Sequence, residues 1–470
     1  MSKLLLIIFL SISLLLCLPS AKSQTLSSTI TLTVDFGSTI SYINNECGGI
    51  LISGDTTVYP PCTSYKDAGN RARQYINGNI PIPDNNALVI NVINTQSSQS
   101  ISGESAQLGN LFGFCDIRVL VETTTSPVII NGASATSHFV SLEEPDQPNT
   151  SYTCSARKLL LVRYINFVNW GNQTIFYVNV NQIDITPKFQ LVYFLYVSTS
   201  GSNSIVNVQP KNSNYEYGYL QFTISSGTFT NISSSLTLAP FNFIATKTSF
   251  VTDKFLNSIL NNSPLIYSKV GHLDLGYFSL INNVIMNNDL PIVKTLNLGN
   301  NYNFNFINVT NSVFSKFLHS ENSQINPQDV SQPFNFYNFL INNNTIISNI
   351  NDPSDSVLSL QNFEGDSYTL SFSNVASNGN QVLGDKPFIW NKNLNTNLLL
   401  CEIPDSFSIG IKTENSNNII FSTLIDSIIP FAGNNSFFDY SMYPLTNSNN
   451  FNYCEVCQII VDGQIVYNTF

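Results

Sequence analysis

Hydrophobic and polar residues alternate over most of this chain in short runs, and each run closes on one or more asparagines. The pattern recurs roughly every 20 to 35 residues. It is clearest at residues 278–286, 302–308 and 339–344. Alternation with period two is typical of half-buried β-strands, and a repeat of this length is typical of a solenoid, in which each coil adds a strand or two to a continuous stack. The pattern therefore predicts an all-β solenoid.

Asparagine has a physical role at the corners of such a stack. A corner residue often needs left-handed backbone angles, which asparagine tolerates better than most residues. Equivalent corners of successive coils lie about 4.8 Å apart, so their amides can bond into ladders, while Ile, Leu, Val and Phe fill the inward positions. A biased composition could also raise the asparagine content everywhere, so not every asparagine marks a corner.

The chain divides into four stretches on this interpretation. Residues 1–23 are a signal peptide, 24–80 an N-terminal strand and capping helix, 81–440 the coils, and 441–470 a C-terminal cap. About 360 residues at about 25 per coil would form about 14 coils and a rod about 65 Å long. A propeller or tandem sandwiches are the alternative, because alternation alone does not fix topology.

One substantial helix is expected before the coils. Ser64 with Asp67 resembles a capping box, and Asn77-Gly78 would stop the helix. The apolar face would consist of Tyr65, Ala68, Ala72 and Ile76, and the residues pointing elsewhere would be Lys66, Arg71 and Arg73. A helix laid across the open end of a stacked sheet would cover its unpaired edge and its apolar interior.

These features together resemble a known family. A strand is followed by Cys47-Gly48-Gly49, then by Pro61-Cys62-Thr63-Ser64 leading into a helix with Ala68, and then by coils punctuated with Asn and Gly. This order is similar to that of the secreted right-handed parallel β-helix proteins, the pectin-lyase-like superfamily, and in particular to its large non-enzymatic group in protists. The resemblance covers nearly the whole mature chain, by architecture rather than by signature. It implies a right-handed parallel β-helix with an N-terminal capping helix.

The first residues predict export. Lys3 precedes an apolar run of about 15 residues at 4–18, which is too short to span a bilayer, and Ala21-Lys22-Ser23 favours cleavage before Gln24. An uncleaved anchor is the alternative. Later segments lack about 18 uninterrupted apolar residues, so we expect a secreted, extracellular chain with no membrane span after cleavage.

Charge and glycosylation sequons fit that location. The whole chain has 19 basic and 30 acidic residues; without Lys3 and Lys22 the basic residues number 17 and the net charge is −13. This balance argues against nucleic acid and anionic membranes, and against a polyanion such as pectate unless calcium mediates the contact. Six sequons are candidate glycosylation sites: Asn149, Asn172, Asn231, Asn308, Asn343 and Asn434. A seventh, Asn261, is disfavoured because Pro264 follows its serine.

Seven cysteines remain after the signal, which removes Cys17. They are the candidates for disulfides at the two ends of the chain: Cys47, Cys62, Cys115 and Cys154 near the front, and Cys401, Cys454 and Cys457 near the back. The front four allow three pairings, of which we favour Cys47 with Cys62. The Cys454-Glu-Val-Cys457 motif could bind zinc, but no histidine lies nearby, so a disulfide to Cys401 is preferred.

Three polar stretches interrupt the coils, at 143–150, 322–333 and 351–355, and are expected to be loops leaving the rod. Such loops, or the flat strand face beside them, often form the binding surfaces of solenoids. Glu143, Glu144 and Asp146 could ligate calcium, but acidic loops are mostly solvated, and we expect no metal site.

The superfamily includes polysaccharide lyases and glycoside hydrolases, whose chemistry can be checked. Four motifs of its inverting hydrolases, Asn-Thr-Asp, Asp-Asp, Gly-His-Gly and Arg-Ile-Lys, are not intact here. The nearest approach is His272 with Asp274 on one strand face. Glu364 and Asp366 would also share a face, about 6 to 7 Å apart, a spacing that could in principle support an inverting hydrolysis. We expect structural roles for these groups.

Other catalytic chemistries also lack their residues. Lyases need a basic residue beside bound calcium, yet all five arginines precede residue 164: Arg71, Arg73, Arg118, Arg157 and Arg163. A Ser/His/Asp site could use only His138, His272 or His319, and the chain has no Gly-x-Ser-x-Gly elbow. We therefore expect no catalytic residue and no cofactor.

A row of tyrosines gives a milder functional signal. Tyr215, Tyr217 and Tyr219 alternate, so all three would project from one side of a strand. Outward, they would form a platform on which sugar rings stack; inward, they would be core. We expect a secreted, glycosylated, non-catalytic protein of the cell surface or matrix that binds carbohydrate or other proteins. The alternatives are a divergent polysaccharide lyase or glycoside hydrolase, and a purely structural rod.

Overall fold

The computed structural model places much of the chain, and in several strands it describes the backbone but not every side chain. The described residues are 29–40, 46–48, 58–77, 86–93, 100–121, 128–144, 158–171, 173–180, 185–190, 193–195, 198–199, 204–211, 220–225, 227–234, 238–251, 253–285, 290–296, 302–321, 331–349, 351–352, 354–373, 376–378, 380–383, 389–401, 406–414, 419–424, 435–436, 456–461 and 464–469. The predicted signal peptide lies outside them.

The described residues are mostly β-strand, in one sheet of 31 strands and another of 7. The large sheet has three faces, numbered here by their pairing. Face 1 contains β4 (Gly109–Asn110), β7 (Val140–Glu143), β10 (Phe176–Val180), β14 (Val206–Pro210), β18 (Phe241–Val251), β21 (Ile266–Gly276), β24 (Pro291–Leu296), β27 (Lys316–Glu321), β30 (Leu358–Ser373), β33 (Ile389–Cys401) and β34 (Ser406–Glu414). Face 2 contains β1 (Thr29–Asp35), β2 (Ala87–Ile93), β5 (Asp116–Val121), β8 (Lys158–Arg163), β11 (Ile185–Gln190), β15 (Leu220–Ser225), the second halves of β18, β21, β30 and β33, and β25 (Tyr302–Thr310), β28 (Ser331–Asn342) and β35 (Ile419–Leu424).

Face 3 is narrower. It contains β3 (Ser100–Ser102), β6 (Val128–Asn131), β9 (Ile165–Val168), β12 (Tyr193–Leu195), β16 (Thr228–Thr230), β19 (Lys254–Leu256), β22 (Ser279–Ile281), the ends of β25 and β28, and β31 (Ala376–Asn378). The second sheet contains β13 (Ser198–Thr199), β17 (Ser233–Ser234), β20 (Ile259–Leu260), β23 (Val284–Ile285), β26 (Val313–Phe314), β29 (Thr345–Ile347) and β32 (Gln381–Leu383). Near the C-terminal end lie β36 (Asn435–Ser436), β37 (Val456–Val461) and β38 (Gln464–Thr469). The helical elements are α2 (Tyr65–Asn77) and the 3-10 turn η1 (Gly132–Ser134).

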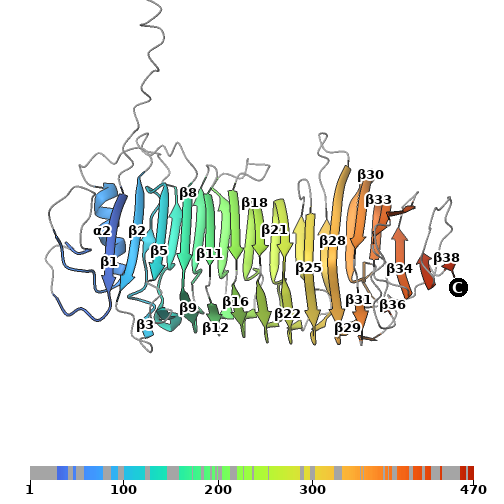
Figure 1. Cartoon of the computed structure of the whole chain (residues 1–470), viewed down its shortest axis with the longest axis horizontal. Helices are drawn as coiled ribbons and strands as arrows, with labels where there is room; N and C mark the ends of the chain where they lie inside the picture. Colours follow the sequence, from blue (N-terminus) through green and yellow to red (C-terminus); the bar gives the residue numbers. More distant parts are fainter. Residues whose placement is uncertain are drawn as a thin grey trace, which may run out of the picture.

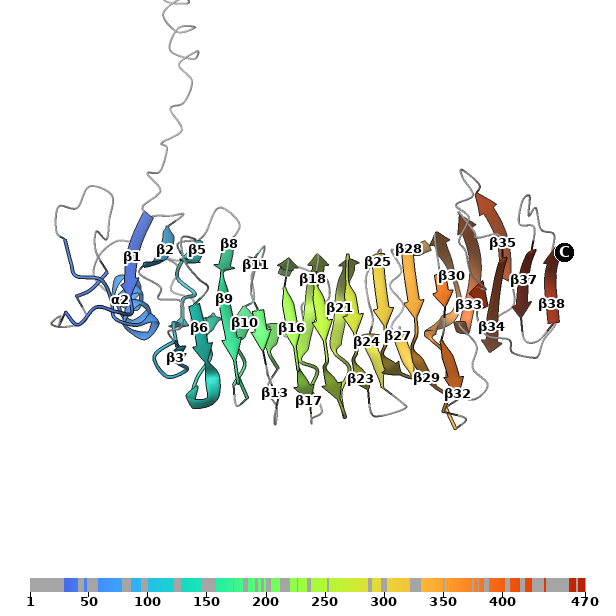
Figure 2. The same cartoon turned by 60° about the horizontal axis from the view of Figure 1, so that its bottom comes forward.

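Pairing within each face is parallel and links segments far apart in the sequence. On face 2, β2 pairs with β5, β5 with β8, and β8 with β11. On face 3, β16 pairs with β19 and β19 with β22. The strands consequently follow one another along an elongated molecule (Figure 1), and β17, β23, β29 and β32 follow its lower edge in Figure 2. We call one passage of the chain through the faces a coil. Among the described pairings, β37 with β38 is antiparallel.

Alternation of the side chains explains the strands. In β2, Leu88, Ile90 and Val92 are fully buried while the residues between them are partly exposed. Phenylalanines stack inside from coil to coil, with centroids 4.5 Å apart for Phe229 and Phe255. The apolar face of each strand thus contributes to one continuous core.

The predicted asparagine corners are present. In six of the described coils the residue that follows face 3 is an asparagine with positive φ: Asn169 (52°), Asn231 (54°), Asn257 (51°), Asn282 (56°), Asn311 (51°) and Asn343 (53°). The next residue turns inward and bonds the following coil. The backbone N–H of Ser258 donates to Asn283 Oδ1 (2.9 Å), that of Asn283 to Ser312 Oγ (3.1 Å), that of Ser312 to Asn344 Oδ1 (2.8 Å), and that of Asn344 to Asn380 Oδ1 (2.9 Å). We call these five residues the corner ladder. Most of its bonds join side chain to backbone, rather than amide to amide as predicted.

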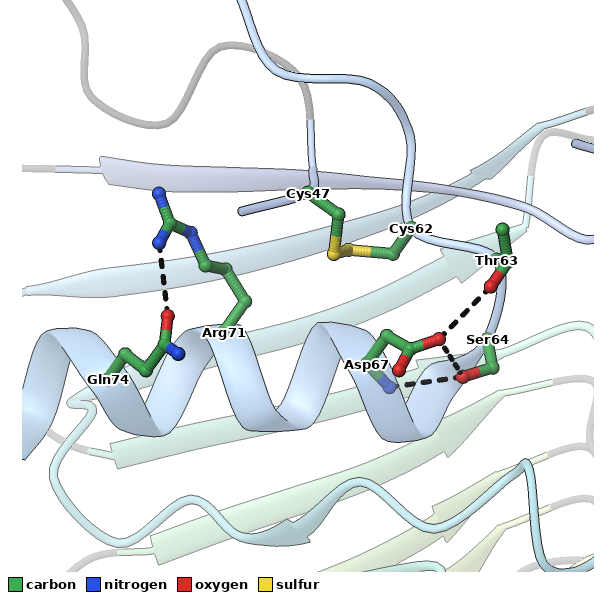
Figure 3. Close-up of a disulfide and its surroundings, with 7 residues drawn as sticks. All are labelled: Cys47, Cys62, Thr63, Ser64, Asp67, Arg71 and Gln74. Carbon is green, nitrogen blue, oxygen red and sulfur yellow. Dashed lines mark hydrogen bonds between the residues drawn. A yellow bond between two sulfur atoms is a disulfide. The ribbon is translucent and has the colours of Figure 1, made fainter. Parts of the chain in front are cut away.

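Helix α2 begins as predicted. Ser64 Oγ accepts from the Asp67 backbone N–H (3.1 Å) and donates to its carboxylate (2.6 Å), which also accepts from Thr63 (Figure 3). The apolar face predicted from the sequence is buried at Tyr65, Ala68 and Ala72. Gly69 lies against the Leu108 carbonyl, where a β-carbon would lie 2.1 Å from the oxygen.

The burial of Arg71 was not predicted. Its side chain is buried, because its guanidinium lies over the rings of Tyr59 (4.8 Å) and Tyr75 (5.3 Å) and donates to Gln74. Stacking and a side-chain acceptor allow this arginine to leave solvent on the packed side of the helix.

The disulfide predicted between Cys47 and Cys62 is present, and it ties two segments beside β1 (Figure 3). The Thr33 N–H donates to the Gly48 carbonyl (2.7 Å), and the Asp35 N–H donates to the Cys62 carbonyl (2.8 Å). The outer edge of β1 is therefore paired. Of the other candidates, Cys115 is also disulfide-bonded, Cys401 and Cys457 are described only as backbone positions in β33 and β37, and Cys154 and Cys454 lie outside the described residues.

Two predicted loops are shorter than expected. Glu143, expected in the first loop, is instead the last residue of β7. The backbone N–H of Glu144 continues the pairing by donating to the Asn179 carbonyl (3.0 Å). Residues 331–333 belong to β28, where they pair with β30. The third predicted loop, 351–355, forms a turn in the residues that the structure describes. There the Asp355 carboxylate accepts a hydrogen bond from Ser348 Oγ (2.6 Å).

Candidate functional site

Two aromatic side chains stand on the surface where face 2 turns into face 3. Tyr277 is 53% exposed and Phe306 is 39% exposed, although most large apolar side chains of the described coils are buried. Their rings lie face to face, with centroids 4.3 Å apart and planes 8° apart. The stack leaves one face of each ring uncovered by its partner.

The backbone at both aromatic residues is strained. Tyr277 has φ 53° and Phe306 has φ 54°, in the left-handed region that bulky residues rarely adopt. Asn338 follows them at the same corner of the next coil, with φ 52°. The left-handed geometry of this corner suits asparagine, yet three described coils carry aromatic rings there: Tyr164 (φ 59°), Tyr277 and Phe306. Residues held in such conformations often mark a functional site.

Polar side chains lie beside the rings on face 2. Asp274, Asn303 and Asn305 occupy outward positions of β21 and β25, and Asn303 is exposed. Asn338 donates to Asn305 across the coils at 3.5 Å, a weak bond. Gly276 contributes no side chain, and a β-carbon there would meet its nearest neighbour only at 3.6 Å. We call this surface the aromatic ledge: Tyr277, Phe306, Asp274, Asn303, Asn305 and Asn338.

The ledge suits a ligand with apolar faces and many hydroxyls. Aromatic faces bind the C–H faces of sugar rings, and amide and carboxylate groups hydrogen-bond sugar hydroxyls. Asp274, which is half-buried beside the rings, accepts a long 3.5 Å bond from Ser249 Oγ and adds a carboxylate to the ledge. No lysine or arginine belongs to it, so the surface is matched to neutral rather than anionic groups.

Tyr277 and Phe306 were not identified from the sequence as exposed residues, although the apolar pattern around them could have indicated it. Each begins an apolar doublet, Tyr277-Phe278 and Phe306-Ile307, between two alternating runs. Where two apolar residues are adjacent in a β chain, one of them must leave the core. The tyrosines predicted as a platform, Tyr215, Tyr217 and Tyr219, lie outside the described residues.

The candidate catalytic groups are only partly brought together. Asp274 belongs to the ledge, whereas His272 is described only as a backbone position of β21. Glu364 and Asp366 lie in β30, where its register with β33 shifts, and their side chains are likewise not described. His138 stacks on Tyr177 with centroids 4.8 Å apart, and its Nδ1 lies 3.0 Å from the Thr174 carbonyl oxygen.

The candidate glycosylation sites fall at different positions. Asn343 is exposed and Asn231 half-buried at the left-handed corners, and Asn308 is half-buried in β25, where it accepts from Thr310 of its own sequon at 2.6 Å. The disfavoured Asn261 is exposed. Asn149, Asn172 and Asn434 lie outside the described residues.

Comparisons with known protein families, curated proteins and solved structures found no match. In the described part of the chain, no helix is long and apolar enough to cross a bilayer. Nor do three or more His, Cys, Asp or Glu side chains gather there to hold a metal ion. The interpretation of the ledge therefore depends on its own geometry.

Proposed function

We propose that this protein is a secreted, glycosylated, non-catalytic right-handed parallel β-helix of the cell surface or matrix, which binds neutral carbohydrate at the aromatic ledge. The observation that carries the proposal is the pair of stacked, solvent-exposed rings at backbone angles that suit asparagine. A purely structural corner would be served better by asparagine, the residue that the next coil uses.

The β-helix assignment is supported by the parallel pairing of successive coils on three faces. The right-handed sense follows from the strong preference of parallel crossover connections. Helix α2 would close the N-terminal end, since it packs its apolar face beside β1 and Leu108. Export is supported by the Cys47–Cys62 disulfide and by the signal-like segment at 1–23.

The binding assignment is tested on a glycan array with the mature protein and a Tyr277→Gly/Phe306→Gly variant. We expect binding to neutral saccharides that falls at least about tenfold in the variant, because stacking on each ring is worth about 1 kcal/mol. Glycine accepts the left-handed angles. It is preferred to asparagine at 277, where Phe278 and Ser279 would complete a new glycosylation sequon.

A matched control is Ile259→Ala, which removes another exposed apolar side chain, 46% exposed in β20. It should leave binding unchanged. If the double variant binds as wild type does, or if it loses stability as much as binding, the rings have a structural role and the proposal is wrong.

The alternative is a divergent polysaccharide-degrading enzyme. Its support is the position of Asp274 two residues after His272 on β21, beside the ledge. Release of reducing ends from a polyuronide or neutral glycan, abolished by His272→Ala or Asp366→Asn, would establish this alternative. Binding without product release would favour the non-catalytic protein.

A further inference from the structure

A second surface, on face 1, gathers titratable side chains from three neighbouring strands. Tyr267 of β21 pairs in register with Lys294 of β24, and Lys294 pairs with His319 of β27. Two residues further along, Lys269 and Glu321 occupy the next outward positions of β21 and β27. We call these five residues the face 1 patch. The ledge and this patch lie on different faces, so the inference below does not rest on the proposed function.

Basic side chains are scarce in this chain, and most that the structure describes have a partner. Lys66 pairs with Glu104, Arg118 with Asp116, Lys316 with Asp352, and Lys211 donates to the Glu144 carbonyl. In the same described set, Lys269, Lys294 and Lys254 have no ion pair or hydrogen bond. Lys254 is exposed to solvent on face 3, whereas Lys269 and Lys294 are half-buried on face 1.

Partial burial without a partner is costly for an ammonium group. Removal from water weakens its hydration, and an opposite charge or an acceptor normally offsets that loss. The backbone positions of Lys269 and Lys294 are diagonal neighbours about 8 Å apart, so both flexible side chains can reach one group between them. Such a pair is arranged to hold an anion.

His319 adds no positive charge to the patch at neutral pH. Burial, then the charges of Lys316 and Lys294, lower the pKa of His319 to about 4, although Asp352 acts in the opposite direction. Its Nδ1 lies 2.9 Å from Ser359 Oγ of β30, and its Nε2 lies 3.8 Å from Glu321 Oε2. The imidazole is therefore neutral above about pH 5, and Lys269 and Lys294 are the positively charged groups of the patch.

Lys316 is not available to bind an anion, because its ammonium group already bonds two residues of the turn beside the patch. It is buried, pairs with Asp352 and donates to Ser354 Oγ (2.8 Å). Burial alone would raise the pKa of Asp352, but the hydrogen bonds from Lys316 and Ser354 outweigh it and lower that pKa. The two free ammonium groups remain Lys269 and Lys294.

We propose that Lys269 and Lys294, with the Tyr267 hydroxyl as a further donor, bind one carboxylate- or sulfate-type oxyanion of a ligand. Two ammonium groups and a hydroxyl supply charge-assisted donors to the oxygens of such a group. Glu321 sits at the edge of the patch and the whole chain carries a net charge of −11, so the site accepts a single anionic group rather than a polyanion.

The test is a titration of the mature protein with sodium sulfate, and separately with sodium acetate, at constant ionic strength held with sodium chloride. The chain has three histidines, so protein labelled only at histidine gives few NMR signals. We expect a saturable shift of the His319 signal, and a higher pH midpoint for it, because a bound anion offsets the field of Lys294 and Lys316. The affinity should fall about tenfold or more in Lys269→Gln and in Lys294→Gln, as expected for loss of one charged hydrogen bond.

Lys254→Gln is the matched control, since it removes an exposed lysine from another face, and it should bind as wild type does. An unchanged His138 signal reports that each variant is folded. A response that does not saturate, or equal affinities in all three variants, would overturn the proposal. Saturation by acetate but not sulfate, or the reverse, would identify the type of oxyanion.

Discussion

At the scale of single residues, Asp253 places a carboxyl group inside the apolar core. The side chain is fully buried, and Oδ1 accepts a 2.7 Å bond from the Gly227 backbone N–H. In the described surroundings Oδ2 has no partner. Burial raises the pKa of Asp253 to about 8, although backbone bonds at Gly227 and Val251 act against it. The carboxyl group is therefore mostly protonated at neutral pH.

Asp253→Asn should remove a pH dependence of stability. The folded chain keeps this proton where the unfolded chain, with the ordinary pKa of 3.8, has released it. The contribution is fully present below about pH 4 and is lost as the pH rises through 8. We expect the free energy of unfolding, measured with denaturant, to fall between pH 4 and pH 8 in wild type and to fall less in Asp253→Asn. Glu104→Gln, which changes an exposed carboxylate, should keep the wild-type slope; equal slopes in all three would contradict the assignment.

At the scale of elements, the corner ladder joins coils through buried side chains. Asn283 accepts from the Ser258 N–H (2.9 Å) and donates to the Phe255 carbonyl (3.0 Å). Asn344 repeats this arrangement toward Ser312 and Val309. Each ladder member thus satisfies backbone groups that the turn leaves without a strand partner.

Asn283→Ala should destabilise the chain far more than a change at its neighbour Asn282. Truncation leaves a buried N–H and a buried carbonyl unpaired, which costs roughly 2 to 4 kcal/mol. Asn282→Gly keeps the left-handed turn at an exposed position and should change stability by less than about 1 kcal/mol. Thermal unfolding of the two variants compares them directly. Similar melting temperatures would show that the ladder bonds add little.

Helix α2 and the corners could be predicted because local signals determine them. Ser64, Asp67 and the apolar spacing define the helix, and asparagine marks the turns. The face of Arg71 could not be predicted, since it depends on Tyr59, which the chain brings over the helix only after folding. The ledge and the patch could not be predicted either. Tyr277 stacks on Phe306, and Lys269 becomes a diagonal neighbour of Lys294, only through pairing between coils, and alternation alone does not encode the register of that pairing.

At the scale of the whole molecule, the two ends of the array differ. Near the N-terminal end the edge of β1 is paired by segments that the Cys47–Cys62 disulfide joins across 15 residues. Near the other end, β37 and β38 form an antiparallel pair. Stability is therefore expected to vary along the length of the molecule, because coils contact mainly their neighbours.

Removing the disulfide should loosen one end and leave the middle intact. For Cys47→Ser/Cys62→Ser we expect a local loss of about 3 kcal/mol, the usual effect of closing a loop of this length. Hydrogen exchange should show faster amides in β1 and α2 and unchanged protection in β21 and β25. Faster exchange throughout would mean that the molecule unfolds as one unit.

The corner ladder has a consequence for how this chain can gain insertions during evolution. Between its successive members the chain grows from 25 to 29, 32 and 36 residues, yet the same kind of bond forms at each step. The surplus lies partly between the strands and partly in longer strands, since β21 has 11 residues and β30 has 16, and every corner restores the alignment of the coils. An insertion between two corners is therefore absorbed where it occurs, without displacing the strands that follow. New loops can accordingly be acquired one at a time, each without refolding the rest.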